Sequence, residues 1–244
     1  MRAAALGAVQ GVAEVLPVSS SAQLTLLPWL LGWPEPTDRT TLAAGLHAGS
    51  CAGIAWSLRH ELPDRRTTGL VVLATVPAAL AGLLAGDLIE RRLGRPGPTA
   101  WLLALAGVAL WAADRRPEDS REIGGREAAV AGLAQVVALA PGVSRAGATL
   151  IALRLLRVEA GTAGRFSTLM SLPVTAGAAG LTLLRSRHAP VGELAVGVPV
   201  AALTGAAAAR ALLRPGVRPA RGAAVYRLAV AAAVAVRLHR KGSS

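Results

Sequence analysis

Runs of hydrophobic residues separated by short charged loops are the main pattern of this chain. A helix that crosses a bilayer needs about 20 mainly apolar residues, and six of the runs approach that length. The loops between them hold clusters of Arg, Asp and Glu, which are too polar to lie in hydrocarbon. The pattern therefore predicts an all-α integral membrane protein with six transmembrane helices. The predicted spans are 41–58, 69–86, 99–113, 166–184, 191–209 and 223–236.

Two further apolar segments, 3–33 and 128–156, are each interrupted near the middle by Pro, Gly and Ser. Backbone that leaves a helix at membrane depth must be buried in protein or face a water-filled cavity, because lipid cannot satisfy its N–H and C=O groups. We expect each segment to form a re-entrant helical hairpin that turns near Pro17 or Pro141. A serine then caps the second half-helix of each hairpin.

The two interrupted segments match each other at an offset of 125 residues. Three spans follow each segment, and an odd number of crossings inverts the second copy relative to the first. We predict a single membrane domain over 1–244, with repeat 1 at about 1–120 and repeat 2 at about 121–244. In such inverted repeats the interrupted segments surround the binding site. The matched pairs include Gly7 with Gly132, Gln10 with Gln135, and Ser19 with Ser144.

The charge pattern excludes nucleic acid as a partner. The net charge is +12, but the arginines lie in short clusters between apolar runs and not along one face. They are expected at the membrane surface, among them Arg154, Arg157 and Arg165. A single cysteine, Cys51, excludes a disulfide framework.

Glu14 and Arg145 are the charged residues next to the interruptions of these two segments. An intramembrane charge costs about 2.5–3.5 kcal/mol on insertion scales, so such residues usually face a cavity and carry function. Arginine offers a planar fork that suits phosphate oxygens, and two half-helix N-termini favour an anion. The alternative is a structural Glu14–Arg145 ion pair that joins the hairpins. His47 lies within a predicted span, where it either packs against small residues or lines the cavity.

Two motifs carry a resemblance to a known family: QGVAEVLPVSSSAQL at 10–24 and PGVSRAGAT at 141–149. At these motifs the chain resembles the undecaprenyl-diphosphate phosphatase family, the bacitracin-resistance type of membrane lipid phosphatase. The resemblance implies six spanning helices with two re-entrant hairpins in the bacterial cytoplasmic membrane, and a pocket open to its outer face. It also implies hydrolysis of a polyprenyl diphosphate to the monophosphate and inorganic phosphate, which recycles the lipid carrier for envelope polymers.

The same resemblance implies roles for individual residues. Glu14 matches the essential carboxylate, Ser20 the proposed nucleophile, and Ser144 with Arg145 the phosphate clamp. A divalent cation, Mg²⁺ or Ca²⁺, is expected to bridge the diphosphate and Glu14. Gln23 stands where the family has a histidine, and glutamine cannot shuttle a proton at neutral pH. The residues expected to bind substrate are Gln10, Ser19, Ser21, Gln23, His47, Gly142, Ser144 and Thr149.

An alternative function is a translocase that moves a polyprenyl phosphate across the bilayer without cleaving it. The inverted repeat and the missing histidine favour it, and the same residues would bind the phosphate. The expected partners in either case are a polyprenyl diphosphate or phosphate lipid and the bilayer. Whether the chain forms a homodimer is left open by the sequence.

Overall fold

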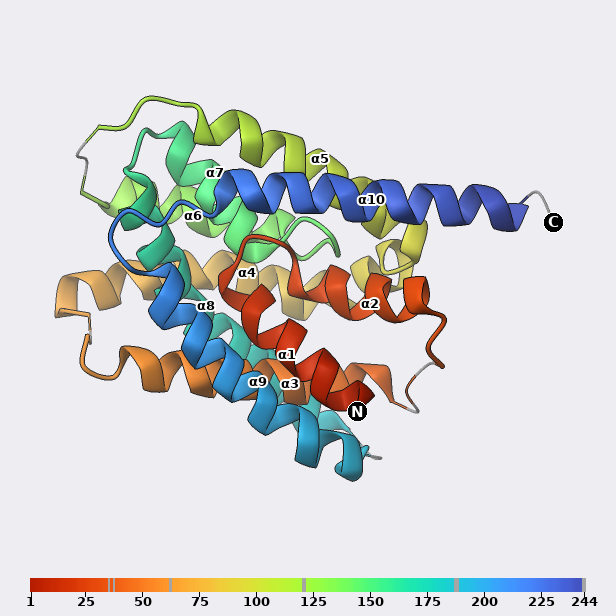
Figure 1. The fold of residues 1–244 in the computed structure, drawn as a ribbon. Coiled ribbons are helices and arrows are strands. Elements are labelled where there is room, and N and C mark those ends of the chain that lie inside the picture. Colours follow the sequence, from red (N-terminus) through yellow and green to blue (C-terminus); the bar gives the residue numbers. More distant parts are fainter. Residues whose placement is uncertain (35, 37, 62, 120–121, 187–188, 243–244) are drawn as a thin grey trace.

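The computed structural model of this chain is all-helical throughout the part that it describes, residues 1–34, 36, 38–61, 63–119, 122–186 and 189–242. Within those residues an isolated β-bridge joins Asp119 to Val158. Figure 1 shows the helices in chain order. They are α1 (Arg2–Val15), α2 (Ser20–Leu31), α3 (Arg39–Leu58), α4 (Arg65–Leu93), α5 (Pro96–Asp114), α6 (Gly125–Val137), α7 (Arg145–Leu155), α8 (Ala160–Arg185), α9 (Val191–Leu212) and α10 (Ala220–Gly242).

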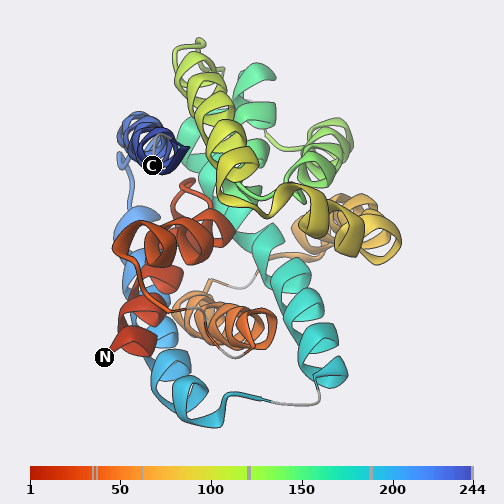
Figure 2. The same cartoon turned by 90° about the vertical axis from the view of Figure 1, so that its right-hand side faces the viewer.

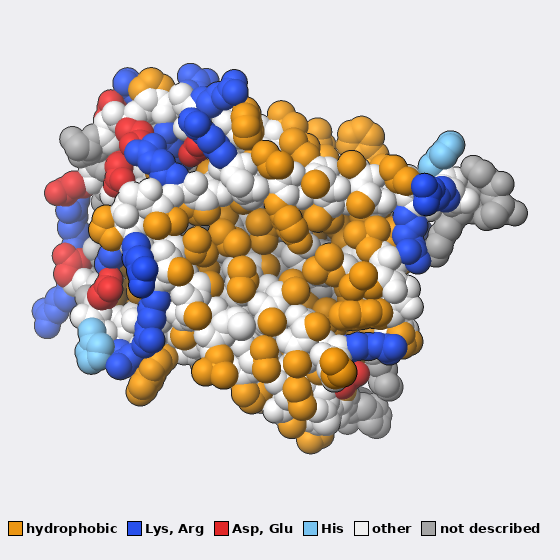
Figure 3. Space-filling model, viewed as in Figure 1, with side chains coloured by type: hydrophobic (Ala, Val, Ile, Leu, Met, Phe, Trp, Pro, Cys, Tyr) orange, Lys and Arg blue, Asp and Glu red, His pale blue; other side chains and the backbone are white. Residues whose placement is uncertain are grey.

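Five helices are long and apolar enough to cross a membrane: α4, α5, α8, α9 and α10. Much of their apolar surface faces outward, as at Leu84 and Leu203, which are 87% and 73% exposed. Figure 3 shows hydrophobic side chains across the middle of the molecule and charged side chains towards its two ends. Outward-facing apolar helices of this length belong in lipid, so the chain is a multi-pass membrane protein.

The remaining predicted span, 41–58, forms α3 but is less apolar than the other five. Helix α3 packs against α1, α8 and α9, and Figure 2 shows it (orange) enclosed by them. It carries His47 and Ser50, which point into the molecule's polar cluster. Asp38 begins the helix by accepting the Thr41 N–H at 2.9 Å, a typical N-cap.

Both interrupted segments are broken into two helices, as the sequence predicts. Helices α1 and α2 pack together as one pair, and α6 and α7 as the other. At 11 to 14 residues each, they extend only about 17–21 Å, less than the roughly 30 Å of a hydrocarbon core. Each turn ends on a serine with a left-handed backbone, Ser19 at φ 66° and Ser144 at φ 72°. This conformation is costly for a residue with a side chain, so both turns are held in place by their surroundings.

The first helix of each hairpin lies directly on a long helix of the other half of the chain. Helix α1 packs on α9, and α6 packs on α4. Gly132 of α6 needs to be glycine, because a Cβ there would lie 2.7 Å from the carbonyl oxygen of Ala74. Gly7, its partner in the sequence match, lies equally tightly against Gly197 of α9.

One expectation for the surface arginines is wrong. Arg154 is only 2% exposed, and its guanidinium donates to the carbonyls of Val158 at 2.7 Å and Arg116 at 2.5 Å. It is buried because it satisfies the free carbonyls where α7 ends against the loop after α5. Arg157 and Arg165 are about half exposed, and each forms a surface ion pair.

Candidate functional site

Glu14, near the end of α1, is the centre of a buried polar cluster. Its carboxylate is 4% exposed. Oxygen Oε2 accepts from Gln10 Nε2 at 2.8 Å and from Ser20 Oγ at 3.3 Å. The Nδ1 atom of His47 lies 2.9 Å from the same oxygen. Three helices, α1, α2 and α3, thus direct polar groups to one carboxylate oxygen.

The other carboxylate oxygen of Glu14, Oε1, faces the second half of the chain. It accepts from Arg145 Nη2 at 3.0 Å and from Thr175 Oγ1 of α8 at 3.1 Å. Arg145 also donates to the backbone carbonyls of Ser167 at 2.9 Å and Glu14 at 3.2 Å. The ion pair that the sequence left as an alternative is therefore present, and it joins the two hairpins.

The serines divide into capping and cluster roles. Ser144 caps α7, since its Oγ accepts the Gly147 N–H at 3.2 Å. Ser19 occupies the corresponding N-cap of α2 without a side-chain cap bond, and its Oγ lies 3.3 Å from Ser21 Oγ. Ser20 is the first residue of α2 and alone of these serines donates to Glu14.

A cavity of about 320 Å³ reaches this cluster from the side where α3 begins. His47 and Thr175, both in contact with Glu14, line it together with Ser21. The His47 side chain is 25% exposed, so it lines the cavity and does not merely pack against small residues. Water and a polar ligand can approach the carboxylate by this route.

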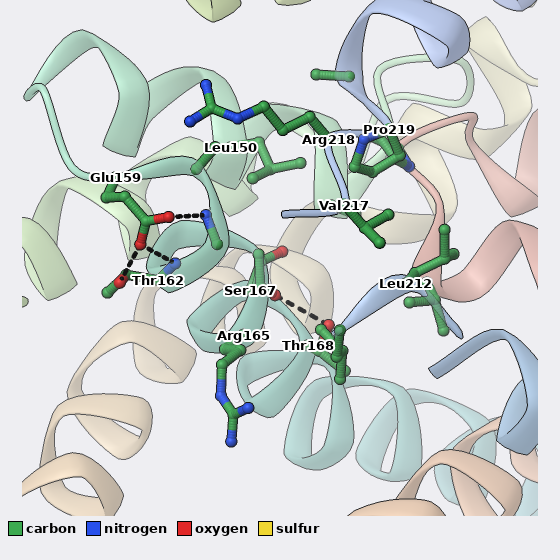
Figure 4. A pocket seen from close by; sticks show the side chains of 18 of the residues that line it. Leu150, Glu159, Thr162, Arg165, Ser167, Thr168, Leu212, Val217, Arg218 and Pro219 are labelled. Atoms are coloured by element: carbon green, nitrogen blue, oxygen red, sulfur yellow. Dashed lines mark hydrogen bonds between the residues drawn. The ribbon is translucent and has the colours of Figure 1, made fainter. Parts of the chain in front are cut away.

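A second cavity, of about 280 Å³, lies at the other end of α8 (Figure 4). Ser167, whose carbonyl holds Arg145, is among its lining residues. Glu159 caps α8 at its rim and accepts the backbone N–H and hydroxyl of Thr162 at 3.1 and 2.8 Å. These hydrogen bonds lower the pKa of Glu159. Along α8, the Glu14–Arg145 pair lies between the two cavities.

Gln23 lies outside the cluster around Glu14. Its side chain is buried, its Nε2 donates to the Val18 carbonyl at 2.9 Å, and its Oε1 accepts from Tyr226 Oη at 2.7 Å. Both ends of the amide are thus used to join the first hairpin turn to α10. A neutral histidine also has one donor and one acceptor, so glutamine can make the same connection.

Gly142 and Thr149 lie behind the cluster as supports. Gly142 has φ 103° and packs on the backbone of α5, where a Cβ would lie 2.9 Å from the Leu103 nitrogen and closer still to the Thr99 carbonyl oxygen. Thr149 is fully buried, one turn after Arg145, and its Oγ1 lies 2.6 Å from Ser167 Oγ. Neither residue lines the cavity that contains His47.

Several cluster residues were missed from the sequence. Thr175, Ser50 and Ser167 lie in ordinary apolar helices, and small hydroxyl residues are too common there to be a signal. Arg227 is different, because it is a charged residue within the predicted span 223–236, the same signal that identifies Glu14 and Arg145. It donates from Nε to the Pro17 carbonyl at 2.5 Å.

The cluster provides oxygen ligands for a hard cation, although few of them. No group of three or more His, Cys, Asp or Glu side chains occurs among the residues that the structure describes. Beside Glu14, however, the Oε1 atom of Gln10 is buried without a hydrogen-bond partner. Mg²⁺ binds through one or two protein oxygens when substrate phosphates and water complete its shell, so this donor set fits such an ion.

Fold and site together define a multi-pass helical membrane protein with a carboxylate, a serine and an arginine brought together by two broken helices. The chain belongs to the bacitracin resistance protein BacA family, and the match extends over residues 3–233. The undecaprenyl-diphosphatase of Gemmatimonas aurantiaca is 38% identical, with 93% of each chain covered. The undecaprenyl-diphosphatases of Pelobacter propionicus and Geobacter sulfurreducens are each 40% identical, with 88% of each chain covered.

Proposed function

We propose that this chain hydrolyses undecaprenyl diphosphate, or a similar polyprenyl diphosphate, to the monophosphate and inorganic phosphate. One observation carries the proposal: Ser20 Oγ donates to Glu14, whose other oxygen is held by Arg145. A nucleophile, a base and a phosphate-binding cation are thereby within one cluster. The relatives are named as phosphatases, which favours hydrolysis over the translocase alternative.

The arrangement in the membrane is six spanning helices, with α3 as the sixth, and two re-entrant hairpins. The swapped packing of α1 on α9 and α6 on α4 supports an inverted repeat over the two halves of the chain. The left-handed serines Ser19 and Ser144 at matching positions support it further. The protein works in the bacterial cytoplasmic membrane, where its lipid substrate is located.

Ser20 Oγ attacks the terminal phosphorus of the diphosphate. A new O–P bond forms, the bond from that phosphorus to the bridging oxygen breaks, and the lipid monophosphate leaves. The serine proton passes to the Glu14 carboxylate, which already accepts it in a hydrogen bond at 3.3 Å. Glu14 then gives the serine proton to His47, and water attacks the phosphoserine while it loses a proton to the freed carboxylate. The bond from phosphorus to Ser20 Oγ breaks, Oγ takes the proton back from Glu14, and inorganic phosphate leaves. His47, 2.9 Å from Glu14 and facing the cavity, passes the proton on to water.

Positive charge around the transferred group lowers the barrier. Phosphoryl transfer is catalysed mainly by positioning and by electrostatic stabilisation of the equatorial oxygens. Arg145 supplies its guanidinium, and the first turns of α2 and α7 supply backbone N–H groups that lack partners inside the helix. Ser19, Ser21 and Ser144 add hydroxyl groups at the same two turns.

A divalent cation, Mg²⁺ or Ca²⁺, is part of this proposal. Glu14 and Gln10 Oε1 would hold it together with oxygens of the diphosphate. When bound, the ion neutralises phosphate charge and orients the leaving group. Gln23, Gly142 and Thr149, expected to bind substrate, are instead proposed to hold the backbone that presents the cluster.

Phosphate release from a polyprenyl diphosphate by purified protein in detergent tests the proposal, with and without a chelator. We expect release that stops on chelation and is lost in Ser20→Ala. Ser57→Ala, a serine of α3 outside the cluster, is the matched control and should release phosphate normally. A folded protein that binds the lipid but releases no phosphate with added Mg²⁺ or Ca²⁺ would refute hydrolysis.

A further inference from the structure

Arg227 of α10 is a buried cation that pairs with no acidic side chain in the described part of the chain. Its residue is 0% exposed, and Nε donates to the Pro17 carbonyl at 2.5 Å. Its other two nitrogens, Nη1 and Nη2, are buried and have no hydrogen-bond partner among the described residues. A charged donor that is buried and unpaired costs free energy, so an arginine in this state is expected to serve a function.

The guanidinium of Arg227 lies where the two hairpins meet. On one side is the turn of the first hairpin at Pro17. On the other is the first turn of α7: a Cβ on Gly147 would lie 3.2 Å from Cζ and 3.3 Å from Nη1, and closer still to Nη2. The N–H groups of a first helical turn lack partners within the helix and favour an anion. The unpartnered guanidinium nitrogens of Arg227 and the N-terminus of α7 therefore lie side by side, and both favour an anion.

Packing alone does not require an arginine here. The offset of 125 residues that relates the two halves places Pro17 on Gly142 and Arg227 on Leu102. In the second half, the turn at Gly142 packs against the backbone of α5 beside Leu102: a Cβ on Gly142 would lie 3.2 Å from the leucine Cβ, 2.9 Å from the Leu103 nitrogen and closer still to the Thr99 carbonyl oxygen. The equivalent position thus carries an apolar side chain beside its turn, whereas Arg227 adds charge and hydrogen-bond donors.

The charge of Arg227 is also not balanced by an ion pair with any residue that the structure describes. Arg145 is paired with Glu14 at 3.0 Å, so that pair is neutral as a whole. A diphosphate brings negative charge on both phosphate groups. In a low-dielectric interior, an anion is drawn to a cation that has no partner.

An apolar groove of about 630 Å³ shows which phosphate this would be. It runs between α1 and α10 and ends at Val18, Gln23 and Tyr226. Tyr226 precedes Arg227 in the chain, and Val18 follows Pro17 in the turn that Arg227 contacts. A polyprenyl chain suits such a groove, whereas the cavity at His47 mixes charged and hydroxyl side chains with apolar ones. The lipid end of the substrate then lies on the Arg227 side of the hairpin.

We infer that Arg227 is an anion-binding residue, and that Nη1 and Nη2 bind the phosphate group that stays on the lipid while Arg145 binds the group that is transferred. The inference rests on the proposed function for its choice of substrate. Because Arg227 has no exposed surface, the turn at Pro17 has to move aside when the lipid phosphate enters.

Binding of farnesyl monophosphate and of inorganic phosphate, measured by thermal shift and calorimetry on the purified full chain in detergent, tests this inference. Arg227→Leu should bind farnesyl monophosphate at least about tenfold more weakly, and Arg227→Lys should retain part of the affinity. Inorganic phosphate, which should take the Arg145 position, should bind both variants as it binds the parent. Arg237→Leu removes an arginine of the same helix that donates to Leu30, and it should change neither ligand's affinity.

A second variant keeps the test valid if Arg227→Leu does not fold. Gly147→Ala keeps the charge but places a Cβ against the guanidinium, so it should weaken farnesyl monophosphate binding as well. Unchanged binding in Arg227→Leu, or in a folded Gly147→Ala if the leucine variant fails, would overturn the inference. A parent protein that binds the monophosphate through Arg227 yet never releases phosphate would overturn the proposed function alone.

Discussion

Glu14→Gln separates a catalytic carboxylate from a structural ion pair. The substitution keeps the shape of the side chain and removes its charge and its basicity. One amide oxygen remains, and it can still accept from Arg145 and Thr175 as Oε1 does at 3.0 and 3.1 Å. The new amide nitrogen takes the position of Oε2, which in the parent lies 2.8 Å from Gln10 Nε2. Two N–H donors would then face each other. Gln10 can turn its unpartnered Oε1 toward the new amide nitrogen, so the clash is relieved.

The two effects differ in size. Stability should fall by about 1–3 kcal/mol, the cost of polar groups left without partners, because most acceptors are replaced and not removed. That is well below the roughly 3–5 kcal/mol expected when one partner of a buried ion pair is removed altogether. Activity should fall by about 10²–10⁴-fold, because the proton acceptor for Ser20 is lost.

Phosphate release and thermal unfolding should be measured on the same detergent preparation. Glu122→Gln is the control, since this carboxylate forms an exposed surface pair with Arg66 at 2.9 Å and should behave like the parent in both assays. A folded Glu14→Gln protein with near parental turnover would remove Glu14 from the mechanism. A protein that unfolds in detergent would show that the ion pair with Arg145 is mainly structural.

Three further predictions follow from the geometry. Arg145→Lys loses the fork that reaches both Glu14 and Ser167, so kcat/KM should fall at least about tenfold, roughly 1.4 kcal/mol; equal steady-state kinetics would reduce Arg145 to a source of general positive potential. Gln23→His should keep the bonds to Val18 and Tyr226 and leave the pH–rate profile without a new limb near the imidazole pKa of about 6.5; a new limb would place residue 23 in the proton path. The pKa of Glu159 is lowered in the folded state, so its stabilising effect is present at neutral pH and is lost as pH falls through that lowered value. The Glu159→Gln variant should therefore lose less stability to thermal unfolding than the parent as pH falls from about 6 to about 3, and parallel curves would contradict this.

Hydrophobic patterning was enough to predict the helices, because lipid leaves the backbone few choices. Every predicted span is helical in the structure, and both interrupted segments break where Pro, Gly and Ser interrupt them. The pattern did not reveal that α3 is enclosed by other helices, because a helix has the same apolar composition whether it contacts lipid or other helices. It also misplaced Arg154, since only the folded chain brings the carbonyls of Val158 and Arg116 to its guanidinium.

A site residue could be predicted from the sequence where its side chain is charged and its segment is otherwise apolar. Glu14 and Arg145 were found by their charge, and the structure brings them to 3.0 Å. Arg227 is also a charged residue in an apolar span, but that span has no break that would mark it as part of a binding site. Contacts such as Thr175 with Glu14 link residues 161 apart in sequence, and no local pattern records them.

The two halves of the chain contribute unequally to the cluster, and this inequality is what makes it suited to chemistry. The 125-residue offset places Ser20 on Arg145, each the first residue of its half-helix after a left-handed serine. Glu14 falls on Leu139, so only the first hairpin supplies a carboxylate. Equivalent backbone positions thus hold the proposed nucleophile on one side and a cation on the other, with the proposed base between them. A symmetric pair of sites would bind two anions alike, whereas this one can bind a phosphate at Arg145 and attack it from Ser20.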